Sequence, residues 1–347
     1  MDQSARWRQV SALAVSTPRS ALPVSVVVVT WQSERVLRAA LAALVLAEPP
    51  PRELIVVDNA STDDSVAVVE AFRPKLPSVD VQVIRNPDNR GFAAAANQGI
   101  ARSGQPFVFL HNPDLCLRPE TLAMLVGALA QAVDDVAVAG PKLLRATGDD
   151  LTPTEVIDTT GIVMRRDGRH LDRGAGELDH GQYDRQGEIF GVSGAAALFR
   201  ASVLAAARVH GEVFDEDFFA FREDADLAWR LRGFGYRALF VPAAVAYHRR
   251  TVTPERRRAL SAAVNMHSVK NRFLLRLHHA DGGWLLRFGL PSLLRDVIVV
   301  GACLTVERSS LAAFPWLARN LARHLRRRRE ILGRRVVPPT ELRSWFR

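Results

Sequence analysis

Acidic and amide side chains stand in this sequence where they could bind a metal ion. Asn112 and Asp114, separated by a proline, follow the apolar stretch 107–110, which predicts a buried strand. A carboxylate at the end of such a strand can hold a hard divalent cation, which acts as a Lewis acid on a bound anion. Taken alone, these residue types also suit a plain turn, so the pattern leaves both interpretations open.

A second acidic cluster, Glu223-Asp224-Ala225-Asp226, opens a helix predicted over 224–233. Carboxylates favour the positive end of the helix dipole and can cap free N–H groups there, which is the structural interpretation. A carboxylate that faces a site can instead take a proton from a hydroxyl group as a general base. Asp226 lies on another face of this helix from Asp224, and we expect it to be structural.

Polar residues also collect at the ends of the earlier predicted strands. Arg90 offers a fork of hydrogen-bond donors to an anion, and Gly91 lets the backbone approach a ligand closely. His248 follows the apolar stretch 244–247, which predicts a strand. A single histidine at such a position is usually a structural residue of the core or surface and not a ligand. The remaining polar residues at strand ends are Thr30, Asp58 and Asn59.

Alternating strands and helices must position these residues. The unbroken β-branched stretch 24–30 predicts a strand buried on both faces. Such alternation predicts a parallel sheet wrapped by helices, with ligands at the carboxyl ends of the strands. The further strands are expected at 54–57, 81–84 and 107–110, and the helices at 33–47, from 61 onward and at 91–102.

The alternation breaks after about residue 140. The polar, glycine-rich segment 145–192 predicts irregular chain and short hairpins over the site. Further strands are expected at 195–199, 238–241 and 244–247, and the chain from 254 onward is expected to be helical.

Length and composition describe an ordinary folded protein. The chain has 347 residues, 48% of them hydrophobic and 24% charged, which excludes disordered, collagen-like and disulfide-rich classes. Two cysteines, Cys116 and Cys303, cannot build a disulfide framework and indicate a reducing compartment.

The positive charge of the protein is concentrated at one end. Residues 249–347 hold 21 Lys and Arg against six Asp and Glu, which predicts contact with a polyanionic surface. The arginine runs 256–258 and 326–329 stand near apolar stretches, which favours an anionic membrane over nucleic acid. The apolar stretches 284–294 and 297–306 each fall short of the roughly 20 residues needed to span a bilayer.

Six segments in this order resemble the family 2 glycosyltransferases of the GT-A fold, most closely their rhamnosyltransferase-like branch. The resemblance covers about residues 22–250 and is specific for the family but not for the sugar. The segments are VSVVVVTWQSE, IVVDNASTDDS, NRGFAAAANQGI, FLHNPD, FREDADLAWRLRGFGY and VPAAVAYH.

The resemblance implies a role for each singled-out residue. Asp114 and His248 would hold Mn²⁺ or Mg²⁺, and Asn112, in place of the family's usual first aspartate, would contact ribose or sugar. Asp224 would be the general base, with Glu223 binding the acceptor or the sugar. The other implied nucleotide-sugar contacts are Thr30, Asp58 and Asn59 at the nucleoside, Arg90 and Gly91 at the diphosphate, Asn97, and Gly194 as a wall of the site.

The resemblance, together with the charge pattern near the C-terminus, implies an overall organisation. We expect an N-terminal extension (1–21), a GT-A domain of mostly parallel sheet and flanking helices (22–250), and a basic helical region (251–347) that attaches to the membrane surface. The expected activity is metal-assisted, inverting transfer of a sugar, from dTDP-rhamnose, to a polyprenyl-linked or cell-envelope glycan. A UDP-hexose or UDP-galactofuranose donor and an inactive GT-A scaffold are the alternatives. The expected location is cytoplasmic, on the inner face of the cell membrane, with no nucleic-acid partner.

Overall fold

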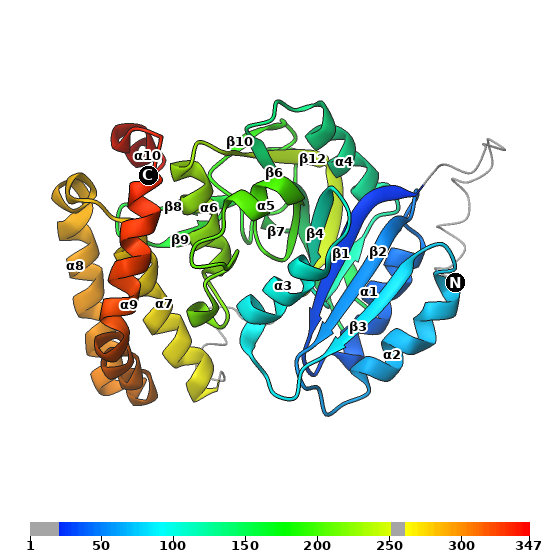
Figure 1. Cartoon of the computed structure of the whole chain (residues 1–347), viewed down its shortest axis with the longest axis horizontal. Coiled ribbons are helices and arrows are strands. Elements are labelled where there is room, and N and C mark those ends of the chain that lie inside the picture. The colour runs from blue at the N-terminus through cyan, green and yellow to red at the C-terminus, as the bar shows by residue number, and fades with distance from the viewer. Residues whose placement is uncertain (1–20, 251–260) are drawn as a thin grey trace.

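The computed structural model describes residues 21–250 and 261–347 of the chain. Because its β-branched side chains are buried on both faces, β1 (Leu22–Thr30) is a central strand, as predicted. Its parallel neighbours give the spatial order β4-β1-β2-β3 and alternate with helices along the chain (Figure 1). The elements of this half are α1 (Glu34–Val45), β2 (Pro51–Asp58), α2 (Ser65–Phe72), the short helix η2 (Arg73–Lys75), β3 (Asp80–Arg85), α3 (Gly91–Arg102) and β4 (Phe107–His111).

The other half of the sheet is mixed and continues the order as β4-β11-β6-β12-β10. β11 runs antiparallel to both β4 and β6, whereas β12 runs parallel to β6. β12 is one strand where the sequence predicts two, because a register shift between Val241 and Val245 replaces the expected break. The strands of this half are β5 (Leu115–Leu117), β6 (Val136–Thr147), β7 (Thr152–Thr159), β10 (Gly187–Ile189), β11 (Ala196–Arg200) and β12 (Arg237–His248).

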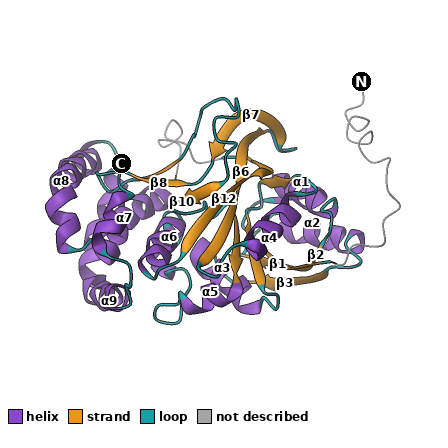
Figure 2. Ribbon diagram, turned by 90° about the horizontal axis from the view of Figure 1, so that it is seen from above, coloured by secondary structure: helices purple, strands orange, loops and turns teal. Residues whose placement is uncertain are grey.

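Helices cover both faces of the sheet, and each face has its own hydrophobic cluster (Figure 2). One cluster takes in α1, α2 and α4 (Thr121–Gln131), and the other takes in α3, α5 (Ala201–Ala206) and α6 (Glu223–Gly233). Segment 145–192 carries the short hairpin of β8 (Ile162–Met164) and β9 (His170–Asp172), as predicted. It also carries β7 and β10, which pair with β6 and β12 in the main sheet, where the sequence predicted irregular chain.

The C-terminal helices gather beyond α6 at one end of the molecule (Figure 1). A third hydrophobic cluster joins them to α6, and in it the rings of Trp229 and Phe346 lie 4.9 Å apart. The short helix η3 (Glu216–Phe218) precedes α6. The C-terminal elements are α7 (Ala262–His279), α8 (Gly282–Thr305), η5 (Arg308–Ala312), α9 (Ala313–Gly333) and α10 (Pro339–Ser344).

α8 corrects one expectation from the sequence. The stretches 284–294 and 297–306 join into a single helix of 24 residues, which is long and apolar enough to cross a membrane by length and composition. Two charged residues, Arg295 and Asp296, lie between these stretches. Asp296 forms ion pairs with Arg272 and Arg276 of α7, at 3.2 and 2.5 Å. The expectation that nothing here reaches spanning length was therefore wrong.

Part of the positive charge near the C-terminus is used inside the protein. Within the run 326–329, Arg327 is buried between two carboxylates and Arg328 donates to two main-chain carbonyl groups near the end of α7. The sequence led us to expect that these two arginines contact a membrane, but both are instead engaged with groups of the protein. The run 256–258 and the predicted extension 1–21, apart from its last residue, lie outside the described residues.

Candidate active site

Strand pairing brings the predicted metal ligands together. β4 ends at His111, and the turn through Asn112 and Asp114 leads directly into β5. β5 pairs with the end of β12, with Leu115 opposite His248. As a result, His248 Nε2 lies 3.3 Å from Asp114 Oδ1 and 3.4 Å from Asn112 Nδ2.

A buried carboxylate that the sequence analysis missed supports His248 from behind. Asp158 of β7 is fully buried, and its Oδ2 lies 2.8 Å from His248 Nδ1. Arg250 approaches the same carboxylate at 2.7 Å. Burial alone raises the pKa of Asp158, but the neighbouring His248 and Arg250 outweigh it and lower that pKa. The signal in the sequence was an aspartate inside the otherwise apolar and threonine-rich end of β7.

The donor set around His248 fits a divalent cation. A carboxylate oxygen of Asp114 and an imidazole nitrogen of His248 lie 3.3 Å apart, and the second imidazole nitrogen is held by a carboxylate, as is usual for histidines that bind metals. Burial opposes protonation of His248, yet Asp114 and Asp158 together raise its pKa to about 10. A cation at this point would take the place of the proton on Nε2.

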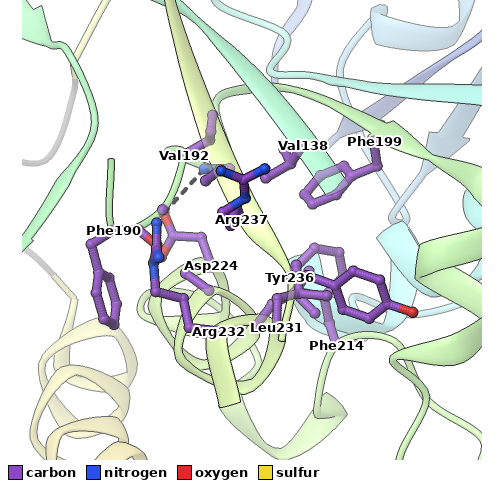
Figure 3. A pocket seen from close by; sticks show the side chains of 15 residues that line it. Val138, Phe190, Val192, Phe199, Phe214, Asp224, Leu231, Arg232, Tyr236 and Arg237 are labelled. Atoms are coloured by element: carbon purple, nitrogen blue, oxygen red, sulfur yellow. Dashed lines mark hydrogen bonds between the residues drawn. The ribbon is translucent and has the colours of Figure 1, made fainter. Parts of the chain in front are cut away.

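The two predicted carboxylates stand at the start of α6. Asp224 Oδ2 accepts a hydrogen bond from the Gly194 main-chain N–H at 3.0 Å, the dashed line in Figure 3. Its Oδ1 accepts one from the Ala225 N–H at 2.7 Å. A Cβ atom at position 194 would lie 3.4 Å from Asp224 Cβ, which is an ordinary contact, so this approach does not depend on glycine. The adjoining pocket drawn in Figure 3 has a volume of only about 20 Å³, which is too small for a sugar.

Glu223 differs from Asp224 in its protonation. Its side chain is buried, and no residue in the described part of the chain forms a hydrogen bond with its Oε2 atom. Burial and the nearby charge of Asp224 raise the pKa of Glu223 to about 8. Glu223 is therefore mostly protonated at neutral pH and can donate a hydrogen bond to a ligand.

Both groups of residues face one cavity of about 360 Å³. The predicted residues that line it are Asn112, Asp114, Gly194, Glu223, Asp224 and His248. The lining residues that the sequence analysis did not single out are Phe92, His170, Asp172, Ser193, Ala195, Ala220, Phe221, Arg222 and Arg250. Among them, burial and the charge of Arg222 lower the pKa of His170 to about 4, so this histidine is neutral.

Thr30 and Asp58 lie next to each other at the ends of β1 and β2. Both are buried, and Thr30 Oγ1 and Asp58 Oδ1 have no hydrogen-bond partner among the described residues. Buried polar atoms of this kind normally have a partner, so the pair is suited to a ligand with N–H groups. Trp31, the residue after Thr30 in the chain, is 54% exposed.

The remaining predicted contacts lie outside the cavity and are engaged with the protein itself. The Asn59 amide group holds the loop before α3 through Asn89 Oδ1, at 3.0 Å, and the carbonyl of Gly91, at 3.1 Å. The Asn97 amide group forms two hydrogen bonds with the main chain of Phe214. Arg90 is half-exposed and lies 3.6 Å from Glu216, so its guanidinium group can reach a ligand.

Comparison with known proteins identifies relatives of the chain. The profile described as Glycosyl transferase family 2 matches residues 25–206. An N-acetylglucosaminyl-diphospho-decaprenol L-rhamnosyltransferase of Mycobacterium tuberculosis is 28% identical over 306 residues, covering 82% of this chain and 93% of that protein. The succinoglycan biosynthesis protein ExoU of Rhizobium meliloti is 31% identical over 137 residues, 38% of this chain. This chain spans only 39% of the length of ExoU.

A solved structure shows the same architecture. The mannosyltransferase PcManGT of Pyrobaculum calidifontis, solved in complex with GDP-Man and Mn²⁺, superposes with a TM-score of 0.52 at 17% identity. The match covers 95% of this chain and 91% of that one. At this identity the likeness concerns the fold alone, which is the GT-A arrangement of sheet and flanking helices.

Proposed function

This chain belongs to glycosyl transferase family 2 and is a glycosyltransferase, and from that premise we propose that it transfers a sugar from a nucleoside diphosphate to a hydroxyl group with inversion at the anomeric carbon. The observation that carries the proposal is the meeting of Asp114, His248 and Asp224 at one cavity of about 360 Å³. That volume falls within the usual range for small-molecule sites.

Asp114 and His248 are the residues that would hold the divalent cation, Mn²⁺ or Mg²⁺. When bound, such a cation supplies Lewis-acid neutralisation of the leaving diphosphate. Asp158 orients the His248 ring so that Nε2 faces Asp114 and the cavity. Asn112, beside them, offers its amide group to the ribose or the sugar.

Asp224 is the proposed general base. Its carboxylate accepts the proton of the acceptor hydroxyl as that oxygen attacks the anomeric carbon. The main-chain N–H of Gly194 holds one carboxylate oxygen in place and so limits its rotation. Glu223, whose pKa is raised to about 8, serves as a hydrogen-bond donor to a hydroxyl group of the acceptor or sugar.

The nucleoside would lie at Thr30 and Asp58, where two buried side-chain oxygens lack partners among residues 21–250 and 261–347. Arg90 would bind the diphosphate, because its guanidinium group offers paired donors. Gly91 has a positive φ of 82°, and a Cβ atom there would lie 2.5 Å from the Phe219 ring, so the loop beside Arg90 requires glycine. In this arrangement Asn59 and Asn97 shape the site through the main chain that they hold.

We expect dTDP-rhamnose as the donor and a polyprenyl diphosphate-linked or cell-envelope glycan as the acceptor. The support is the similarity to the Mycobacterium tuberculosis rhamnosyltransferase, which extends over 93% of that protein. A UDP-hexose or UDP-galactofuranose is the alternative donor for the same site.

Donor hydrolysis tests the proposal without an acceptor. The chain is incubated with Mn²⁺ and one donor at a time, and release of the nucleoside diphosphate is measured. The donors are dTDP-rhamnose, UDP-glucose, UDP-N-acetylglucosamine and UDP-galactofuranose. We expect release from dTDP-rhamnose that falls when EDTA is added and when Asp114 is changed to Ala. Asp149→Ala, at an exposed position, is the matched control. Metal-independent release, or equal release by the Asp114→Ala variant, would contradict the proposed metal site.

We further propose that α8 attaches the protein to an anionic membrane surface on the cytoplasmic side. Its outward face is apolar, and Leu286 is 91% exposed. The ion pairs of Asp296 with α7 hold α8 against the rest of the protein, which favours a helix lying in the interface over one that leaves the fold to span the bilayer. The exposed apolar residues are Leu285, Leu286, Leu290, Leu293, Leu294, Val297, Ile298 and Leu304.

The domain division that we propose has the catalytic unit at 22–250 and a helical region at 251–347 that carries the membrane contact. Hydrophobic packing of Trp229 in α6 against Trp284 in α8 joins these two parts, with ring centroids 6.1 Å apart. They are therefore parts of one folded unit.

A further inference from the structure

The segment that leads into α6 has an unusual backbone. Phe219, Phe221 and Arg222 have φ angles of 64°, 71° and 71°, although none of them is glycine. Non-glycine residues in the left-handed region are strained and persist only where the surroundings impose the conformation. Because Arg222 immediately precedes Glu223 and Asp224, this strained segment determines where the two carboxylates enter the cavity.

One side chain of the C-terminal region holds the segment from outside the catalytic domain. Asn271 of α7 is fully buried, and its Nδ2 atom lies 2.8 Å from the carbonyl oxygens of Phe218, Ala220 and Phe221. Its amide N–H groups thus reach the main chain at three points of the strained segment. An aliphatic side chain of the same size could not satisfy these buried carbonyl groups.

Three other contacts hold the segment, or the residue just before it, from two sides. On one side, the carbonyl of Phe219 accepts a hydrogen bond from the Ala93 N–H at the start of α3, at 3.0 Å. On the α7 side, the His267 ring stacks on the Phe219 ring, with centroids 4.5 Å apart. The adjacent Lys270 donates to the carbonyl of Asp217, just before the segment. The segment 218–222 is therefore fixed between the proposed diphosphate-binding loop and α7.

We infer that Asn271 is a positioning residue for the transfer reaction, so that α7, although it lies outside the catalytic unit 22–250, contributes to catalysis as well as supporting the membrane-facing helix. By holding the segment 218–222 in its strained form, Asn271 keeps Asp224 within reach of Gly194 and Glu223 turned toward the cavity. A displacement of about 1 Å at a reacting group can cost on the order of 10²-fold in rate, so a remote hydrogen bond can matter to turnover. The inference rests on the proposed role of Asp224 as the general base.

The test compares Asn271→Ala with Asn265→Ala in the full chain. Asn265 is also a buried asparagine of α7, and within the described residues its side chain makes no hydrogen bond to the segment 218–222. The measurements are nucleotide affinity, Tm, and kcat and KM for hydrolysis of the most active donor of the panel. In hydrolysis, water takes the place of the acceptor hydroxyl group and loses its proton to Asp224. Turnover is referred to the fraction of chains that bind nucleotide, so that unfolded chains do not count.

We expect Asn271→Ala to lower kcat by at least about tenfold, with KM and nucleotide affinity within about twofold of the parent chain. Asn265→Ala should have the kcat of the parent chain, even if it lowers Tm as much as Asn271→Ala does. Asn271→Ser, which keeps one short hydroxyl donor, should retain more turnover than the alanine variant and serves as the second variant if that one folds poorly. Equal kcat for the Asn271→Ala and Asn265→Ala variants would overturn the inference, as would a loss confined to Tm and nucleotide affinity.

Asp224→Asn in the same assay separates the two proposals. If Asp224→Asn abolishes turnover and Asn271→Ala leaves it unchanged, the positioning role is wrong while the general base stands. If Asp224→Asn also leaves turnover unchanged, the proposed mechanism itself is wrong.

Discussion

His248 and Asp158 lie 2.8 Å apart, Nδ1 to Oδ2, at a point where β12 and β7 both flank β6. This contact fixes which imidazole nitrogen faces the cavity. The carboxylate is fully buried and also pairs with Arg250, so its position is determined by the fold rather than by a ligand.

Asp158→Ala should weaken metal-dependent nucleotide binding by about 10- to 100-fold, the usual effect of removing a carboxylate that orients a metal-binding histidine. Calorimetric titration of nucleotide with and without Mn²⁺ measures it. Asp172→Ala removes the other carboxylate that pairs with Arg250 and should leave the Mn²⁺ dependence closer to that of the parent chain. Unchanged Mn²⁺ dependence in the Asp158→Ala variant would contradict the proposal that Asp158 orients a metal-binding His248.

Asp224→Asn should separate binding from chemistry. The amide keeps the shape of the side chain, so fold and nucleotide affinity should be preserved, whereas loss of a general base typically lowers the rate by 10²- to 10⁴-fold. Glu223→Gln should cost less, because a protonated glutamate and a glutamine can both donate a hydrogen bond. Rates of transfer and Tm are compared for the two variants. If Glu223→Gln has the larger effect, the base has been assigned to the wrong member of the pair.

Glu223 should make stability depend on pH. Its pKa is raised from 4.5 to about 8 in the folded protein, so the unfolded chain loses this proton at lower pH than the folded one. The stability that comes from the buried neutral form is complete below about pH 4.5 and is lost progressively as the pH rises through about 8. We therefore expect the Tm of the Glu223→Gln variant, relative to that of the parent chain, to rise between pH 5 and 8 and then level off. A Tm difference that stays constant with pH would rule out the buried neutral carboxyl group.

α8 should determine binding to anionic vesicles. Leu286→Glu together with Leu290→Glu places two charges on its exposed face and should greatly reduce co-sedimentation with vesicles that contain anionic lipid. Leu46→Glu, at a residue 62% exposed in the segment after α1, is the matched control and should bind as the parent chain does. Binding of the double variant at the parent level would place the membrane contact elsewhere.

Local patterns in the sequence determined much of the fold. Buried β-branched runs predict strands such as β1 because such side chains suit a pleated strand that is covered on both faces. The acidic start of α6 and the polar ends of β1, β2 and β4 could also be predicted, because helix starts and strand ends depend on a few neighbouring residues. Asp114, Asp224 and His248 could thus be singled out from the sequence.

Only the tertiary structure decided which of these residues meet and what supports them. The pairing of β12 with β5 places His248 beside Asp114, and Asp158 reaches His248 from a segment that read as irregular. Asn271 looks like any polar residue of a C-terminal helix, yet it holds three carbonyl groups of a segment about 50 positions earlier in the chain. Such partners follow from long-range strand pairing and helix packing, whereas the periodicity of a sequence reports which face of an element is buried and not what that face contacts.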